Sequence, residues 1–273
     1  MSVKINPMRK YVRPGGLPHF FCPGCGAAQV LQYFTRAVDD LGLDLGKMVT
    51  IGGVGCTARI PVYLHADTLH GVHGRTLAWA MGMKLANPEL KVVVFAGDGD
   101  AVSIGGNHFI HAARRNLDVT MIVVNNLNFA MTGGQVAPTT PINSVTTTTP
   151  YGSGEPSFDI CKLAEAAGAT YVARWTPNKP LQAIKSIKTA LSHKGFSVVE
   201  IVAQCPTHFG RYAIGSGKPE ELLKWIDARS ITKAQADKLD ATEVDGKFVL
   251  GEFVNIERPV FGGTTSYEAG RAK

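Results

Sequence analysis

Two short apolar runs, each followed by a polar turn, constrain the fold of this chain most strongly. The first run, Val92–Ala96, leads into Gly97-Asp98-Gly99-Asp100, and the second, Val119–Val124, leads into Asn125-Asn126. Both runs are rich in β-branched residues and bounded by turn formers, which is typical of buried parallel strands. The segment between them is long enough for one crossover helix, so we expect a β-α-β unit.

The two polar turns predict a site for a cation and a phosphate. Ligands of a parallel sheet collect beyond the carboxyl ends of its strands, so both turns are expected to face the same ligand. Asp98 offers a carboxylate and Asn126 an amide oxygen, which are ligands that Mg²⁺ prefers. Flanking glycines let backbone N–H groups approach phosphate oxygens closely. Either turn alone is an ordinary loop, but Asn125 follows Asp100 by 25 positions and both turns end strands, so the pair favours a functional site.

The rest of the chain is expected to extend this unit into one α/β domain, a mostly parallel sheet flanked by helices. With 273 residues, 45% of them hydrophobic, the chain can bury a sizeable core. Helices are expected at Ala27–Leu41, Gly74–Ala86, Asp159–Ala167 and Pro180–Ser192. Further strands are expected at Met48–Ile51, Thr170–Arg174, Phe196–Ala203 and Lys247–Phe253.

Changes in composition divide the chain into three parts. Residues 1–20, rich in Pro, Gly and basic residues, are expected to form an extended arm before the main domain at residues 21–205. Residues 206–273 are more polar and are expected to wrap over that domain or contact another subunit. The long Thr- and Pro-rich stretch 136–157 predicts a functional or subunit-contacting loop.

Composition also excludes several classes of protein. No apolar run approaches the length of a membrane-spanning helix, and the first residues lack the apolar core of a secretory signal, so a cytoplasmic protein is expected. The formal charge of +6 and the pI near 9.1 suit acidic partners such as phosphorylated cofactors, coenzyme A or an acidic electron carrier. Nucleic acid is not an expected partner, because the 28 Lys and Arg residues form no basic run.

The five cysteines indicate metal or redox chemistry. Cys22 and Cys25 form a C-x₂-C pair, whose spacing alone fits zinc, a thioredoxin-like pair or an iron–sulfur cluster. Cys56 and Cys205 each follow a predicted strand, so four thiolates are available, as a [4Fe–4S] cluster requires. Cys161 lies in a helical pattern and is expected to be ordinary core.

The spacing of Gly97–Asp100 and Asn125–Asn126 resembles the signature of thiamine-diphosphate enzymes. The continuation through Met131–Gln135, MTGGQ, resembles the β subunits of 2-oxoacid:ferredoxin oxidoreductases, and the likeness extends from about Phe21 to about Cys205. It implies a Mg²⁺ ion bound by Asp98, Asn126 and the main-chain carbonyl of Asn128. It also implies a [4Fe–4S] cluster bound by Cys22, Cys25, Cys56 and Cys205. The cofactor contacts that it implies are Val54, Gly55, Cys56, Thr57, His73, Gly99, Asp100, Ala130 and Met131.

The same resemblance implies a function. The family decarboxylates a 2-oxoacid at thiamine diphosphate, transfers the acyl group to coenzyme A, and passes electrons through the cluster to ferredoxin. The glutamate that polarises the cofactor comes from an α subunit in that family, so we expect an (αβ)₂ assembly and assign no catalytic residue to this chain. A non-oxidative thiamine enzyme would leave the cysteines without a use. A zinc-stabilised nucleotide-binding scaffold would leave the two polar turns unexplained.

The substrate prediction rests on two opposing features. Pyruvate-using or broad-range relatives often carry Lys in a GLTKGQ stretch, where this chain has Gly133, and a dicarboxylate needs a cation for its distal carboxylate. The stretch MTGGQVAPTTP and the polar tail, however, resemble the branch that uses 2-oxoglutarate. We therefore favour 2-oxoglutarate over pyruvate, with the cation supplied by Arg75 or by the α subunit. Arg75 is equally well explained as a helix cap.

Overall fold

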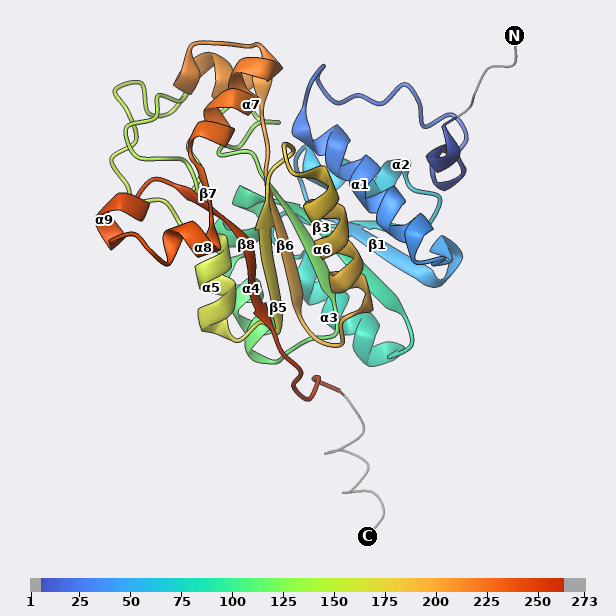
Figure 1. Cartoon of the computed structure of the whole chain (residues 1–273). Helices are drawn as coiled ribbons and strands as arrows, with labels where there is room; N and C mark the ends of the chain where they lie inside the picture. The colour runs from blue at the N-terminus through green and yellow to red at the C-terminus, as the bar shows by residue number, and fades with distance from the viewer. Residues whose placement is uncertain (1–5, 263–273) are drawn as a thin grey trace.

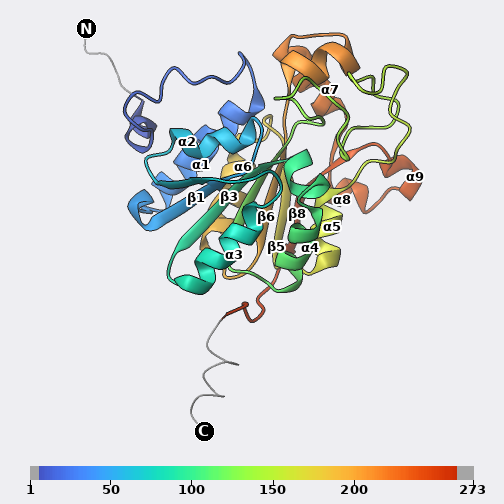
Figure 2. The same cartoon turned by 180° about the vertical axis from the view of Figure 1, so that it is seen from behind.

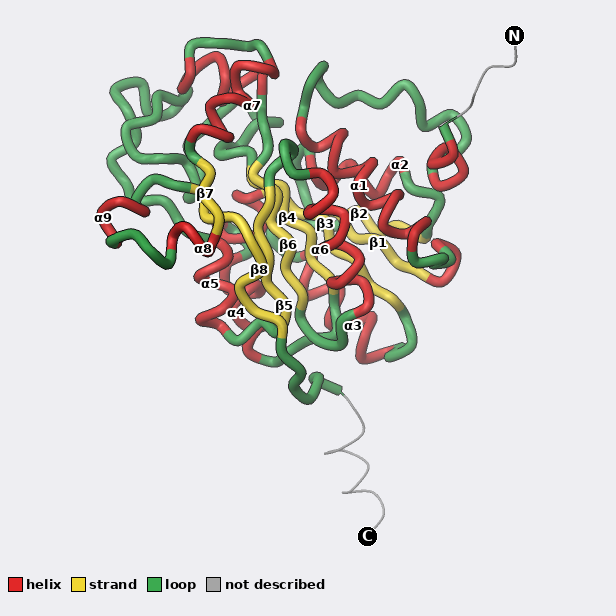
Figure 3. Tube along the Cα trace, viewed as in Figure 1, coloured by secondary structure: helices red, strands yellow, loops and turns green. Residues whose placement is uncertain are grey.

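One eight-stranded sheet organises the chain (Figure 1), and the computed structural model describes residues 6–262. Its strand order is β2-β1-β3-β4-β6-β5-β8-β7, and the strands are visible as the central yellow layer in Figure 3. The strands are β1 (Met48–Gly52), β2 (Asp67–His70), β3 (Lys91–Gly97), β4 (Thr120–Asn125), β5 (Tyr171–Trp175), β6 (Ser197–Val202), β7 (Ser230–Thr232) and β8 (Phe248–Asn255).

The pairing of the strands confirms the predicted fold class. Strands β1 to β6 are all parallel to one another. Strand β8 runs antiparallel to β5 and parallel to β7. All parallel strands therefore end at the same edge of the sheet, which lies at the top in Figure 1. The predicted β-α-β unit is β3, the helix α4 and β4.

Helices cover both faces of the sheet. Helices α1 and α6 lie on the face turned to the viewer in Figure 1, and α3, α4 and α5 lie on the opposite face, which Figure 2 shows. The α-helices are α1 (Gly26–Asp40), α2 (Ile60–Tyr63), α3 (Thr76–Ala86), α4 (Gly106–Arg114), α5 (Ile160–Ala167), α6 (Pro180–Ser192), α7 (Pro219–Ala228), α8 (Lys233–Ala236) and α9 (Ala241–Val244). The chain also forms 3₁₀ helices at η1 (Pro7–Tyr11), η2 (Leu45–Lys47) and η3 (Thr57–Arg59), and π-helical turns at η4 (Gly99–Ser103) and η5 (Pro206–Ile214).

The central strands are apolar throughout because both of their faces are covered. On β3, Val93 and Phe95 belong to the core under α1 and α6, whereas Val92 and Val94 belong to the core under α3, α4 and α5. All four side chains are at most 2% exposed. Continuous apolar runs are the expected pattern for parallel strands buried on both sides.

The predictions from the sequence were less accurate for the ends of the chain than for its middle. Part of the arm forms the 3₁₀ helix η1, so the prediction of an extended arm is wrong there. Strand β2 is polar and half-exposed, and it was not predicted. Residues 206–262 add β7 and β8 to the sheet, and the division of the chain at residues 20 and 205 stays a prediction. Residues 1–5 of the predicted arm and 263–273 of the predicted extension lie outside the described residues.

The sequence predicted no membrane-spanning helix. Within residues 6–262, none of the helices combines the length and the apolar character needed to cross a bilayer.

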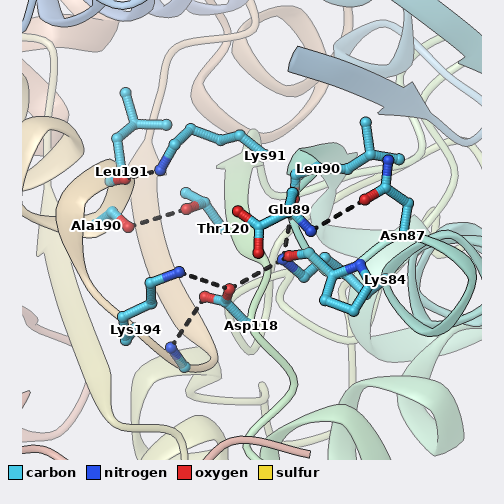
Figure 4. A network of polar contacts seen from close by, with 12 residues as sticks. Lys84, Asn87, Glu89, Leu90, Lys91, Asp118, Thr120, Ala190, Leu191 and Lys194 are labelled. Carbon is cyan, nitrogen blue, oxygen red and sulfur yellow. Dashed lines mark hydrogen bonds and ion pairs between the residues drawn. The ribbon is translucent and has the colours of Figure 1, made fainter. Parts of the chain in front are cut away.

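A buried ion pair joins the last turn of α3 to the segment before β4, at the edge of the sheet opposite the polar turns (Figure 4). The Lys84 ammonium lies 3.0 Å from Asp118 Oδ2 and donates to the carbonyls of Pro88 and Leu90 at 2.6 and 2.9 Å. The lysine side chain is 8% exposed and the aspartate side chain 17%. Burial alone would raise the pKa of Asp118, but the hydrogen bond and the charge of Lys84 outweigh it, and the pKa lies below its ordinary value.

We expect Asp118→Asn to lower the free energy of unfolding by about 1–2 kcal/mol at neutral pH, because it leaves a buried ammonium without its counter-ion. Since the folded pKa of Asp118 is depressed, its contribution is complete above the unfolded pKa of roughly 4 and is lost as the pH falls below that value. Urea unfolding of the wild type and of Asp118→Asn between acid and neutral pH measures the difference in the free energy of unfolding. A difference that stays constant or grows toward acid pH would contradict the assignment.

Candidate functional site

Most of the predicted site residues follow four strands that are neighbours in the sheet, whereas Cys22 and Cys25 precede α1 and His73 follows β2. Strands β1, β3, β4 and β6 are adjacent and parallel, so the turns after them meet at one edge. These turns are 53–57, 98–100, 126–128 and 204–205. The sequence expectation that separate polar turns share one location therefore follows from strand order alone.

A cavity lies at this edge, and its walls contain every residue predicted to bind the cofactor or Mg²⁺. It is lined by Val54, Gly55, Cys56, Thr57, His73, Gly97, Asp98, Gly99, Asp100, Asn126, Asn128, Phe129, Ala130, Met131 and Thr132. The structure brings these residues together, and their binding roles stay predictions. Gly97, Phe129 and Thr132 were missed, because nothing in the sequence distinguishes them from other residues of the same turns.

Three oxygen atoms in the cavity have the spacing of metal ligands. The terminal atom of the Asn126 amide, placed as Oδ1, lies 2.8 Å from the main-chain oxygen of Asn128 and 3.2 Å from Asp98 Oδ1. With Mg–O bonds of about 2.0–2.1 Å, neighbouring oxygens of an octahedron lie roughly 2.9 Å apart. Without a cation, the amide would turn so that its nitrogen donates to both oxygens. The donor set would fit a hard divalent cation, which would stabilise the orientation with Oδ1 inward.

The carboxylate of Asp98 is buried, which disfavours its ionised form in the absence of a nearby cation. Asp98 is 1% exposed, and burial raises its pKa to about 7, although a hydrogen bond from Thr139 acts in the opposite direction. A divalent cation beside the carboxylate would favour its ionised form. Thr139 comes from the long loop that was predicted to be functional, but no sequence signal identified this residue.

Asp100 acts mainly on His73. One of its carboxylate oxygens pairs with His73 Nδ1 and also accepts from the backbone N–H of Gly74 at 2.7 Å. The other oxygen is buried and faces Gly53, where a Cβ atom would lie only 2.1 Å away. Asp100 therefore lines the cavity as predicted, but its visible role is to orient the imidazole, which leaves Nε2 of His73 as its free ring nitrogen.

A glycine is needed in the acidic turn for steric reasons. A Cβ atom on Gly99 would lie 2.2 Å from the ring of Phe129, so the two turns can approach each other only without a side chain at this position. This contact explains one of the glycines of the GDGD motif by packing, in addition to any contact with phosphate.

The four predicted cluster ligands lie near one another. The backbone N–H of Gly26 donates to Gln204 O at 3.1 Å, and the Gln204 amide donates to Gly24 O at 2.9 Å, which ties the C-x₂-C loop to the segment before Cys205. Cys56 packs against the small apolar group that contains Cys205. All five cysteines are free thiols.

The state of these thiols indicates what they can bind. Burial, together with the neighbouring cysteines, raises the pKa of Cys25 to about 11 and that of Cys56 to about 12. These thiols would lose their protons and become thiolates only next to a bound metal cation. Within residues 6–262, no three His, Cys, Asp or Glu side chains lie close enough to share one metal ion. In a [4Fe–4S] cluster each thiolate binds a different iron.

Two other predictions have mixed outcomes. Cys161 is fully buried in the core as expected, but its thiol also donates to Glu200 Oε2 at 3.2 Å, a contact that the sequence did not indicate. Arg75 stands at the start of α3 without a side-chain capping bond, and it donates to Ile104 O at 2.9 Å. It is absent from the described residues that line the cavity.

Comparison with known proteins agrees with this site. Residues 50–201 match the family model of the thiamine pyrophosphate enzyme, C-terminal TPP binding domain. The chain is 49% identical over 257 residues to 2-oxoglutarate synthase subunit KorB of Methanocaldococcus jannaschii, across 94% of this chain and 95% of that protein. It is 40% identical to the β subunit of 2-oxoacid:ferredoxin oxidoreductase 2 of Aeropyrum pernix, across 69% of this chain and 61% of the relative.

The fold also matches a solved structure, that of 2-oxoglutarate:ferredoxin oxidoreductase from Magnetococcus marinus with 2-oxoglutarate, coenzyme A and succinyl-CoA bound. The TM-score is 0.83 and the identity 32%, over 97% of this chain and 94% of the other. The Methanocaldococcus relative and the solved structure each match nearly the whole chain. The chain belongs to the KorB family, the β subunits of 2-oxoacid:ferredoxin oxidoreductases, and contains their thiamine pyrophosphate-binding domain.

Proposed function

We propose that this chain is the β subunit of an enzyme that oxidatively decarboxylates 2-oxoglutarate to succinyl-CoA, or runs the reverse carboxylation, with ferredoxin as electron carrier. The printed activities of its relatives support this substrate. Its cofactors would be thiamine diphosphate, Mg²⁺ and one [4Fe–4S] cluster. The five free thiols support a cytoplasmic location, where cysteines stay reduced.

The position of Cys56 carries the proposal. Cys56 lines the cofactor cavity and also lies near Cys25 and Cys205, so one turn contributes to both predicted sites. A cluster bound there would be close to the cofactor, as electron transfer between them requires. A non-oxidative thiamine enzyme has no use for this proximity.

The residues of this chain would bind and orient the cofactor. Thiamine diphosphate, when bound, supplies the nucleophilic carbon that attacks the 2-oxo group and stores the electrons released by decarboxylation. Asp98, Asn126 and the Asn128 carbonyl would hold Mg²⁺, and through it the diphosphate. Backbone N–H groups of the Val54–Thr57 turn would face the phosphate oxygens, and His73, held by Asp100, would contribute Nε2.

The cavity is incomplete without a partner. Its lining among the described residues contains two aspartates and no glutamate, so the group that polarises the cofactor would come from the α subunit. Val54 and Met131, both at the cavity, are 38% and 39% exposed, which supports a partner covering them. An (αβ)₂ assembly is the arrangement we propose. The cation for the distal carboxylate of 2-oxoglutarate would also come from the α subunit, since Arg75 is bonded elsewhere.

We expect Asp98→Ala to remove both Mg²⁺ and thiamine diphosphate, because the ion is the strongest charge holding the diphosphate. Metal analysis and cofactor quantification of the purified αβ complex measure both losses. Asp118→Ala, an identical substitution at the far edge of the sheet, should keep the cofactor. Stoichiometric thiamine diphosphate in the Asp98 variant would refute the metal assignment.

Single Cys→Ser variants test the cluster. Serine at position 22, 25, 56 or 205 is expected to lower iron and sulfide content sharply, because each thiolate would bind its own iron. Cys161→Ser is the matched control, since a hydroxyl can still donate to Glu200, and it should keep full iron content. Iron and sulfide analysis under anaerobic conditions provides the measurement. A colourless wild-type protein that contains zinc would support the scaffold alternative instead.

Steady-state kinetics test the reaction. We expect kcat/KM of the αβ complex, with coenzyme A and an artificial electron acceptor, to be higher for 2-oxoglutarate than for pyruvate. The isolated chain should turn over neither acid, because half of its cofactor pocket is missing. An equal or higher value for pyruvate would reverse the choice of substrate, and turnover by the isolated chain would disprove the shared site.

A further inference from the structure

A buried ionic network lies beneath the turn that carries Asn126 and Asn128. Glu200 on β6 and Arg174 on β5 are register partners, and Arg174 Nε donates to Glu200 Oε2 at 2.7 Å. Glu200 is 1% exposed and Arg174 4%. A second carboxylate, that of Asp159 at the start of α5, also pairs with the guanidinium. The proposed mechanism uses none of these three charged groups.

The network reaches the turn through the last residue of β4. Asn125 Nδ2 donates to Glu200 Oε1 at 2.8 Å, and Asn125 Oδ1 accepts from the backbone N–H of Leu127 at 3.1 Å. A carboxylate can only accept and a backbone N–H can only donate, so the Asn125 amide has a single satisfactory orientation. Glu200 thereby fixes the acceptor that Leu127 needs.

Leu127 requires such support because its backbone is strained. Its φ angle is +64°, in the left-handed region that few residues other than glycine adopt, and its side chain is 2% exposed. The strained residue stands between Asn126, whose amide end lies 3.2 Å from Asp98 Oδ1, and Asn128, whose main-chain oxygen lies 2.8 Å from that amide. A relaxed Leu127 would change the direction of both oxygens.

We propose that Glu200 is a positioning residue for the magnesium site, acting through Asn125 on the strained turn at Leu127. This inference rests on the proposed function, because it assigns the ligands Asn126 and Asn128 to Mg²⁺. Arg174 holds the Glu200 side chain in place in the core, and Asp159 pairs with the same guanidinium. The network thus connects α5, β5 and β6 to ligands that none of them contributes.

Glu200→Gln tests the direction of the hydrogen bonds. If the glutamine oxygen stays with Arg174, its NH₂ group faces Asn125, whose amide must turn over to accept from it. The turned amide presents NH₂ to the Leu127 N–H, and the support of the turn is lost. We expect the Mg²⁺ concentration for half-maximal binding of thiamine diphosphate to the αβ complex to rise about tenfold, the effect of one lost buried hydrogen bond. Hydrogen exchange at the Leu127 amide should also accelerate.

Asn125→Asp in the same chain should rescue this defect. A carboxylate at 125 accepts from both the glutamine NH₂ and the Leu127 N–H, so the double variant restores both bonds, with donor and acceptor exchanged only between positions 125 and 200. Alone, Asn125→Asp places two carboxylates side by side and should also weaken Mg²⁺ binding. We expect the double variant to return within about threefold of the wild-type value, whereas independent defects would multiply.

Asp118→Asn is the matched control for a purely structural role. It neutralises a carboxylate of another buried ion pair, at the opposite edge of the sheet (Figure 4), and should lower stability while leaving Mg²⁺ dependence unchanged. If Glu200→Gln does not yield folded complex, Asn125→Ala replaces it. That variant keeps the ion pair intact and should show the same tenfold loss.

Two results would decide against the inference. Wild-type Mg²⁺ dependence in Glu200→Gln, or in Asn125→Ala where that variant is used, would overturn it. A double variant no better than the single ones would do the same. The Asp98→Ala variant distinguishes a failure of the positioning role of Glu200 from a failure of the magnesium site itself. Retained cofactor in that variant overturns the magnesium site itself, whereas lost cofactor with an unaffected Glu200 variant overturns only the positioning role.

Discussion

The structure depends on the parallel arrangement of four adjacent strands, β1, β3, β4 and β6. Their carboxyl ends meet at one edge of the sheet, so four short turns that are far apart in sequence become neighbours. The first turn carries Cys56, the second Asp98, the third Asn126 and the last Cys205. An oxygen-rich site and a sulfur-rich site consequently form side by side, and neither requires a dedicated domain.

At both sites, burial makes the ionised side chains unfavourable in the free chain. Burial raises the pKa of Asp98 to about 7 and that of Cys25 to about 11, so the free chain resists the ionised forms that metals require. The packing of the surrounding core offsets this cost and holds the groups in place. Bound metal would then stabilise the fold by mass action, because an unfolded chain offers no comparable site.

The sequence predicted the centre of the molecule better than its edges, for a physical reason. Strands β3 and β4 are apolar on both faces, and α6 has a helical apolar pattern, so burial determines their structure. Strand β2 is half-exposed and polar, and its place depends on pairing with β1, which local pattern does not reveal. The site residues could be named from motifs, but the contact of Thr139 with Asp98 depends on how a long loop folds back.

The Asn125-Asn126 motif does not reveal the role of its first asparagine. The sequence indicates a metal ligand at Asn126 from chemistry alone, whereas Asn125 faces the opposite way, toward Glu200. Glu200 is held by Arg174, which also donates to Val249 O on β8 at 3.4 Å. A strand beyond residue 205 thus touches the network that supports the turn. Hydrogen bonds through the core therefore link the carboxyl-terminal part of the chain to the turn that carries the predicted metal ligands, in addition to its contacts on the surface.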